Sequence, residues 1–174
     1  MASRKMPAQK PGRSKQDYAT EKAFIDAVEH RFGLLAWDLA ADAENAVTPG
    51  RFFDVERDAL KQDWHPIAGW LWLNPPYSDI GPWAAKCAEE MKHGATILLL
   101  TPASVGAGWF HDHIVRNAHV IELRDRICFD GKNPFPKDLI LSVFAHRLTG
   151  RSSWRWKQEL ARAKAREDEL NKRR

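Results

Sequence analysis

Short apolar runs alternate with amphipathic segments along residues 20–146, and this alternation constrains the fold more than any other feature of the 174-residue chain. Runs of roughly four to eight apolar residues are too short for helices and suit strands buried on both faces of a parallel sheet. Segments with apolar side chains at every third or fourth position suit helices that cover such a sheet. We therefore expect an α/β domain with a mainly parallel sheet and helices on both faces.

The individual elements follow from the same patterns. We expect a helix over residues 20–32, with Thr20 as its N-cap and Gly33 as its stop. The other expected elements are strands at 34–40, 70–73, 96–100, 119–123 and 139–146, a possible short strand at 52–55, and helices at 80–91 and 109–118. These elements belong to an expected domain at residues 17–150, preceded by a basic arm at 1–16 that we expect to be disordered and followed by a basic helical segment at 151–174.

The charge distribution is uneven along the chain. The net charge is +4, but residues 1–16 carry five basic and no acidic residues, and residues 151–174 carry nine basic and four acidic ones. The middle of the chain, residues 17–150, has 13 basic against 19 acidic residues. Any affinity for a polyanion must therefore come largely from the two ends and from local patches. The alternative is that the charged ends serve solubility alone.

Other features exclude several classes of protein. No apolar run reaches the roughly 18 residues that cross a bilayer, and the basic N-terminus has no apolar stretch of a secretory signal, so we expect a cytoplasmic protein. The only cysteines, Cys87 and Cys128, lie far apart, and we expect two buried free thiols. His111 and His113 are two residues apart in an expected helix and so point to different faces, and we expect no metal site.

The sequence Asn74-Pro75-Pro76-Tyr77 directly follows the apolar run at 70–73. Ligands bind at the carboxyl ends of the strands in α/β sheets, and this motif lies at such an end, as does the segment Asp38–Asp42. The Asn74 side-chain oxygen and the Pro75 carbonyl can accept hydrogen bonds from the two N–H bonds of a planar amino group. The prolines fix φ and hold the loop nearly rigid. The Tyr77 ring offers a surface for stacking a base. The competing interpretation is a proline turn in which Tyr77 only packs.

A series of further motifs flanks this loop in a specific order. They are Tyr18-Ala19-Thr20, Trp37-Asp38-Leu39-Ala40-Ala41-Asp42 with Asn45, Asp58-Ala59-Leu60 with Trp64, Pro82-Trp83 with Lys86, Leu100-Thr101-Pro102-Ala103 with Trp109-Phe110, Arg126-Ile127-Cys128-Phe129, and Ser142-Val143-Phe144. With this order and spacing, residues 17–147 resemble the phage-type DNA N6-adenine methyltransferases. The chain departs from the family pattern in lacking a Gly-rich cofactor loop and in having Glu21, not proline, after Thr20.

The resemblance implies a Rossmann-like class I methyltransferase fold with S-adenosylmethionine as the methyl donor and no metal. It implies that Asn74, Pro75, Pro76 and Tyr77 form the catalytic loop and act on adenine N6 in double-stranded DNA, with base flipping. The residues implied to bind the donor are Thr20, Asp38, Leu39, Ala40, Asp42 and Asp58, although Asp58 equally fits a solvated helix start. A bacterial host cytoplasm and a phage or prophage origin follow from the same resemblance.

The DNA contacts are expected from basic side chains near the site and in the C-terminal segment. They are Arg124, Arg126 and Lys132 around the loop between the last two expected strands, and Arg151, Arg155 and Lys157 beyond it. Trp109, Trp154 and Trp156 either touch bases or pack. Two alternative functions remain at this point: methylation of RNA adenine or of a protein glutamine, whose amino nitrogen has similar geometry, and a catalytically inactive DNA-binding module with the same fold. The oligomeric state and the recognition sequence are not readable from the sequence.

Overall fold

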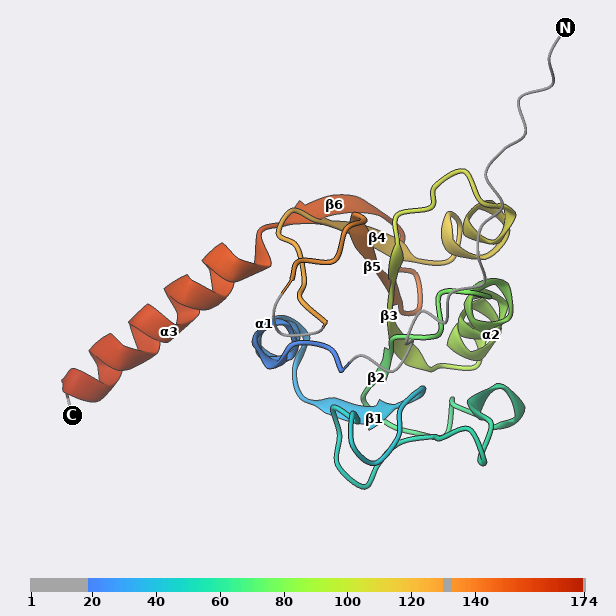
Figure 1. The fold of residues 1–174 in the computed structure, drawn as a ribbon, viewed down its shortest axis with the longest axis horizontal. Coiled ribbons are helices and arrows are strands. Elements are labelled where there is room, and N and C mark those ends of the chain that lie inside the picture. Colours follow the sequence, from blue (N-terminus) through green and yellow to red (C-terminus); the bar gives the residue numbers. More distant parts are fainter. Residues whose placement is uncertain (1–18, 130–132, 174) are drawn as a thin grey trace, which may run out of the picture.

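A computed structural model describes residues 19–129 and 133–173 of the protein, so the expected arm at 1–16 and Lys132 lie outside the described residues. The described chain forms one six-stranded sheet in the order β1-β2-β3-β5-β4-β6, with helices packed on it (Figure 1). The strands are β1 (Leu35–Asp38), β2 (Trp70–Leu73), β3 (Thr96–Pro102), β4 (His119–Leu123), β5 (Leu139–Phe144) and β6 (Gly150–Trp154). The helices are α1 (Lys22–Phe32), the 3-10 helix η1 (Ala59–Lys61), α2 (Gly81–Lys92), the π-helical turn η2 (Phe110–Ile114) and α3 (Trp156–Lys172).

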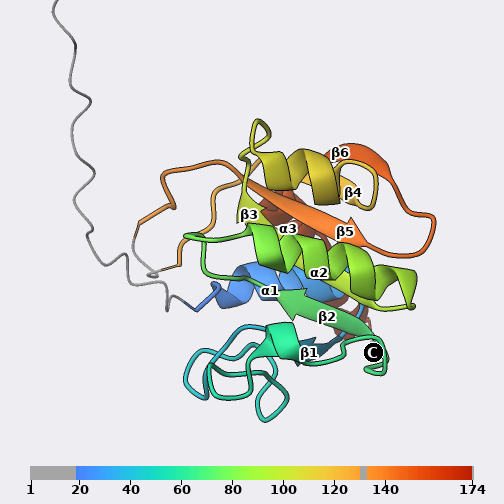
Figure 2. The ribbon, with the colours of Figure 1, turned by 90° about the vertical axis from the view of Figure 1, so that its right-hand side faces the viewer.

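The sheet is mixed, so the expectation of a mainly parallel sheet holds only in part. The pairs β1–β2, β2–β3 and β4–β6 are parallel, whereas β5 pairs antiparallel with both β3 and β4. Figure 2 shows β5 and β2 pointing in opposite directions. β5 thus separates two parallel sets of strands. Its continuous apolar sequence reflects a central position, buried on both faces, and that pattern does not reveal strand direction.

Each face of the sheet has its own core, because side chains alternate between faces along a strand. Leu71 and Leu73 of β2 pack with α2 and η2, and Trp72 packs with α1 and the start of α3. Ile97 and Leu99 of β3 continue the first core and Leu98 and Leu100 the second. Helices therefore cover both faces, as the sequence predicts, with α1 and α2 on opposite sides of β3 in Figure 1.

The helix boundaries differ from the expected ones in two places. The N-cap of α1 is Glu21, not Thr20, because Thr20 is buried and its hydroxyl accepts a hydrogen bond from a side chain of another element. The end of α1 is as predicted: Gly33 has a φ of 98°, which favours glycine, and its N–H donates to Glu29 O at 2.9 Å. The helix expected at 109–118 is instead the short π-helical turn η2.

The C-terminal segment begins with a strand that the sequence analysis does not predict. Its polar sequence Gly150–Ser153 has no strand pattern, but it pairs in parallel with β4 at the edge of the sheet. Trp154 and Trp156 are 2% and 1% exposed and pack against Phe24 of α1, so they belong to the core and do not present their rings to bases. Beyond these anchors, α3 extends away from the rest of the protein (Figure 1).

A buried carboxylate fixes the segment between η1 and β2. Glu90 in α2 accepts hydrogen bonds from Lys86 Nζ at 2.9 Å, from Trp64 N at 3.0 Å and from His65 N at 2.9 Å. Burial opposes ionisation of this carboxyl group, but the hydrogen bonds outweigh burial and lower its pKa to about 2. Trp64 in turn donates from its ring N–H to Ala59 O at 2.9 Å. This network attaches η1, and the residue Asp58 before it, to α2.

The described residues bear on the expectations about membrane segments, cysteines and metal ligands. No described helix is long and apolar enough to cross a membrane. Cys87 and Cys128 are both free; Cys87 is buried as predicted, but Cys128 is only half-buried. In the described part of the chain, no group of three or more His, Cys, Asp or Glu side chains is arranged to hold a metal ion.

Candidate active site

Five strands end at one edge of the sheet, and the candidate site lies there. β1, β2 and β3 are mutually parallel, and β4 and β6 share their direction because β5 is antiparallel to both β3 and β4. We call this side the carboxyl edge; it consists of the segments that follow Asp38, Leu73, Pro102, Leu123 and Trp154. The predicted donor segment at 38–42 and the predicted catalytic loop at 74–77 lie at this edge after adjacent strands.

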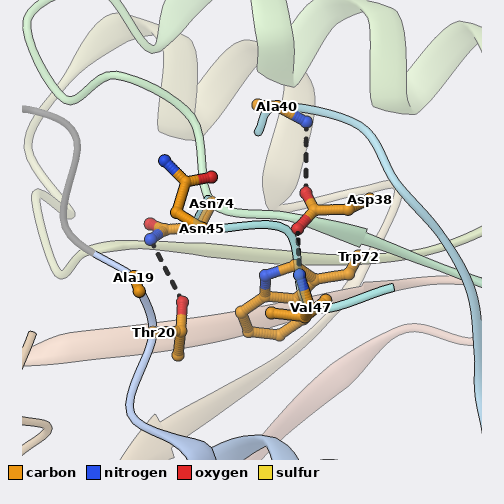
Figure 3. Close-up of a pocket in the computed structure, with 8 residues that line it drawn as sticks. All are labelled: Ala19, Thr20, Asp38, Ala40, Asn45, Val47, Trp72 and Asn74. Atoms are coloured by element: carbon orange, nitrogen blue, oxygen red, sulfur yellow. Dashed lines mark hydrogen bonds between the residues drawn. The ribbon is translucent and has the colours of Figure 1, made fainter. Parts of the chain in front are cut away.

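Asp38 is a buried carboxylate at the end of β1. It is 3% exposed, and it accepts hydrogen bonds from Ala40 N at 3.2 Å and from Val47 N at 3.0 Å (Figure 3). Burial raises its pKa to about 6, although the two backbone hydrogen bonds act in the opposite direction. No basic side chain among the described residues pairs with it. Asp38 therefore provides a poorly solvated negative charge at the carboxyl edge, which favours a cationic ligand.

Asn74 is oriented by Thr20, a residue 54 positions earlier in the chain. The Asn74 Nδ2 donates to Thr20 Oγ1 at 3.3 Å, and this use of the nitrogen leaves the Asn74 Oδ1 available as an acceptor. Both residues line a small pocket of about 30 Å³ together with Asp38 and Ala40 (Figure 3). Ala19, Asn45, Val47 and Trp72 complete its lining. The structure thus brings Thr20, Asp38, Ala40 and Asn74 together around one pocket.

A larger pocket of about 500 Å³ adjoins the small one and shares Ala40, Asn45 and Asn74 with it. Its walls also include the predicted residues Leu39, Asp42, Asp58 and Pro76. The remaining lining residues are Ala41, Phe53, Asp54, Val55, Ala59 and Trp83. A pocket of this size, with apolar walls and a few acidic groups, is typical of a site for a nucleoside-sized ligand.

Two loops give the larger pocket its shape. Asp42 and Asn45 are joined by reciprocal hydrogen bonds: Asn45 Nδ2 donates to Asp42 Oδ2 at 2.9 Å, and Asp42 N donates to Asn45 Oδ1 at 2.9 Å. Asp58 precedes η1 with a left-handed φ of 44°, and its carboxylate pairs with Lys61 at 3.0 Å. Asp58 therefore lies at the start of a helix and also lines the larger pocket. Its position fits both the solvated helix start and the donor contact considered from the sequence.

Pro75 and Tyr77 of the predicted catalytic loop lie to the side of these pockets. Pro75 is buried, whereas Tyr77 is half-buried and lines neither pocket. The Tyr77 ring packs edge-on against Phe129 and Phe135, with ring centroids 6.4 and 5.8 Å away. Its hydroxyl is buried and has no hydrogen-bond partner among the described residues, and burial raises its pKa well above the ordinary value. The Tyr77 ring therefore packs against two phenylalanines, as the competing interpretation predicts, and its half-buried side chain leaves part of its surface accessible.

The unpartnered hydroxyl of Tyr77 leads to a prediction about thermal stability and turnover. Tyr77→Phe removes only a buried group without a partner, so we expect the melting temperature to rise by about 2–4 °C, the shift that ~1 kcal/mol produces in a domain of this size. Because the stacking surface remains, turnover on DNA should stay within a fewfold of the wild-type value. Tyr77→Ala is the matched comparison and should lose roughly 10- to 100-fold in kcat/KM, the loss expected for one base–aromatic stack. A lower melting temperature for Tyr77→Phe would contradict the assignment of the hydroxyl as unpartnered.

The predicted DNA-binding residues that the structure describes differ in their position and in whether they form an ion pair. Arg124 and Arg155 directly follow β4 and β6 at the carboxyl edge, and both are exposed. Arg126 instead donates to Phe135 O at 2.8 Å and pairs with Asp138 at 3.1 Å, which ties down the chain after β4. Arg151 lies near the start of β6, away from the carboxyl edge, and pairs with Glu122 at 3.3 Å. Lys157 lies in the first turn of α3.

Sequence reasoning missed several residues of the larger pocket, and for Asp54 a signal existed. The candidate strand at 52–55 is a single parallel bridge between Phe52 and Asp38, extended by a hydrogen bond from Phe53 N to Asp38 O at 2.9 Å. Asp54 lies just after this bridge, much as Asp38 lies at the end of β1, and an acidic residue at the end of the second strand is the usual ribose ligand of nucleotide-binding α/β folds. Val55 and Trp83 carry no comparable sequence signal.

The sequence of the chain matches a known protein family. A family model described as DNA N-6-adenine-methyltransferase (Dam) matches residues 8–140, which is more than half of the chain. The chain belongs to this family. A DNA N-6-adenine-methyltransferase of Escherichia phage T1 is 34% identical to it over 104 residues. That match covers 60% of the chain and 43% of the phage protein, so the chain spans less than half of this Dam-family relative. No solved structure matches the chain. The resemblance to phage-type adenine methyltransferases is thereby confirmed.

Proposed function

We propose that this Dam-family protein transfers the methyl group of S-adenosylmethionine to N6 of adenine in double-stranded DNA, with the target base flipped out of the helix. The observation that carries the proposal is the orientation of Asn74, whose nitrogen is held by Thr20 while its oxygen is left as an acceptor beside the acidic pockets. Family membership and the name of the phage relative support DNA adenine as the substrate.

The two pockets fit the chemistry of the methyl donor. Bound S-adenosylmethionine supplies a methyl group on a positively charged sulfur, and it also carries an ammonium group and ribose hydroxyls. Asp38 offers a buried negative charge without a cationic partner, which suits a cationic part of the donor. Asp54 and Asp58 line the larger pocket as acceptors suited to ribose hydroxyls, and Phe53 and Val55 provide apolar surface for the adenine ring. The Rossmann-like class I fold is part of the proposal; β5, reversed within the sheet, is compatible with it.

The catalytic loop activates the amino group by position and charge. The lone pair of an adenine amino nitrogen is delocalised into the ring, which makes the nitrogen a poor nucleophile. Two acceptors, Asn74 Oδ1 and the Pro75 carbonyl oxygen, hold its two hydrogens and favour a more tetrahedral nitrogen. Pro75 and Pro76 fix the backbone, so little reorganisation is needed at the moment of reaction. Tyr77 provides the stacking surface that offsets part of the unstacking cost.

A direct assay tests the proposal. The full chain is incubated with donor labelled in its methyl group and with DNA duplexes that contain adenine, and the nucleosides are then separated. We expect the label in N6-methyladenine. Label in cytosine, in RNA adenine or in protein glutamine, with none in DNA adenine, would overturn the proposal.

The alternative of an inactive DNA-binding module makes a different prediction for the same protein. Such a module needs no donor site, whereas the acidic pockets predict calorimetric binding of S-adenosylmethionine to the chain without DNA. We expect that binding signal, and its absence would favour the inactive module. Methylation of RNA or protein has no feature of the site in its favour over DNA.

A further inference from the structure

Two cations at the carboxyl edge and two on α3 form no ion pair among the described residues. Arg124 and Arg155 are exposed and follow the ends of β4 and β6, and Lys157 and Lys164 are exposed on α3. None of the four forms an ion pair with a carboxylate in the described part of the chain. Lys157 Nζ lies 5.0 Å from the centre of the Trp156 ring, a contact that holds the side chain without neutralising it. Arg126 and Arg151, by contrast, are paired with Asp138 and Glu122.

The two sides of α3 face different edges of the sheet. Lys157 Nζ lies 5.0 Å from the centre of the Trp156 ring, whose Nε1 donates to the backbone oxygen of Asp125 at 3.0 Å, and Asp125 follows β4 at the carboxyl edge. Two residues after Lys157, Glu159 accepts from Arg31 at 3.3 Å, and Arg31 lies at the end of α1, close to the start of β1. A helix turns about 100° per residue, so Lys157 and Glu159 point in nearly opposite directions. The Lys157 side of α3 therefore faces the carboxyl edge and the Glu159 side faces away.

Helical spacing sorts the remaining basic residues of α3 onto these two sides. Lys164 is seven residues after Lys157 and lies within about 20° of it. Arg166 is seven residues after Glu159 and shares its side, and Arg162 lies within about 60° of Glu159. The helix thus carries a lysine pair on the side that faces the carboxyl edge and an arginine pair on the opposite side. Figure 1 shows that this part of α3 extends beyond the sheet, with no other element along it.

We infer that Arg124, Arg155, Lys157 and Lys164 form a binding surface for the phosphate backbone of duplex DNA, which runs along the carboxyl edge and continues beside α3. The surface rests on the proposed function, since it places the duplex next to Asn74. Charge complementarity carries the assignment: the cations follow β4 and β6, which end at the same edge of the sheet as the acidic pockets after β1 and β2, and the phosphates are the part of DNA that attracts them. Lys157 and Lys164 are about 10 Å apart along the helix axis, which matches contacts to separate phosphates.

Two double variants with the same change in charge test this surface. Binding of a labelled duplex of about 20 base pairs is measured by fluorescence anisotropy at several salt concentrations for wild type, Lys157→Gln/Lys164→Gln and Arg162→Gln/Arg166→Gln. The lysine variant should bind at least tenfold more weakly, and the slope of log K against log salt should fall by about two, because two phosphate contacts are lost. The arginine variant should stay within about twofold of wild type.

The possible results are distinct. If both variants bind DNA equally weakly, only the total charge matters and the assignment of this surface is wrong. Unchanged DNA binding by the lysine variant would also contradict the assignment. A lysine variant that loses affinity for an RNA hairpin but not for DNA would also overturn it. If the pattern holds while the wild-type protein methylates no DNA, the binding surface stands and the proposed function fails. If the wild type methylates DNA and the lysine variant binds normally, only the surface fails.

Discussion

Asn74→Ala should reduce turnover on duplex DNA by at least about a hundredfold, the size typical of removing one preorganised hydrogen-bonding group from the reacting centre. The variant loses the acceptor for one hydrogen of the target amino group, and it also loses the hydrogen bond to Thr20. Donor binding should change little, because the acidic residues of both pockets remain. The measurements are single-turnover methylation with saturating DNA and calorimetric titration with the donor.

Asn74→Asp is the matched control for this variant. It keeps an acceptor oxygen in the same position but cannot donate to Thr20 Oγ1 from a nitrogen. We expect it to retain more turnover than Asn74→Ala, which separates the acceptor function from packing. Asn74→Ala with nearly wild-type turnover would show that the loop is a proline turn and that methyl transfer occurs elsewhere.

Asp38→Asn should weaken binding of S-adenosylmethionine by about 10- to 100-fold at pH 7.5, the range expected for a charge-assisted contact worth ~1.5–3 kcal/mol. The substitution removes the buried negative charge while keeping the side-chain volume and one oxygen for a backbone N–H group. Because the pKa of Asp38 in the folded protein is about 6, wild-type donor affinity should also fall by about tenfold between pH 7.5 and 5.0. The affinity of the variant should be much less sensitive to pH, and a wild-type affinity that does not change over this range would contradict the assignment.

The same pKa shift predicts a stability effect of opposite sign in the protein without donor. A carboxyl group whose pKa rises on folding favours the folded state when it is protonated, so its contribution is present below about pH 4 and is lost as pH rises through 6. A rise of about two units corresponds to ~2–3 kcal/mol. The free energy of unfolding of Asp38→Asn, relative to wild type, should therefore increase between pH 4 and pH 7. Chemical denaturation of both proteins at the two pH values measures this difference.

The opposite effects of Asp38→Asn on stability and on donor binding have one cause. An ionised Asp38 accepts two backbone hydrogen bonds but has no cation beside it among the described residues, so folding without the donor leaves its charge poorly compensated. A cationic donor would provide that compensation. The residue is thus placed for binding at a cost to the stability of the protein alone, a trade-off common at functional sites.

The sequence by itself determined where the candidate site lies along the chain and which chemistry is proposed for it. The strand at 70–73 and the loop at 74–77 follow from local physics, since a short apolar run stopped by two prolines has few other structures. The family resemblance added the donor segment at 38–42, and the structure places this segment beside the loop because parallel strands end at a common edge.

Only the tertiary structure decided the strand directions, the partners of individual side chains and the side of α3 that faces the site. β5 and β6 show why: an apolar run does not encode strand direction, and a polar run such as 150–153 becomes a strand only when β4 is available beside it. Thr20 is suited to a helix cap by type, yet its contact with Asn74 bridges 54 positions of sequence. Likewise, only three-dimensional contacts separate the paired Arg126 and Arg151 from the unpaired Arg124 and Arg155, because charge in a sequence carries no information on which carboxylate lies within reach.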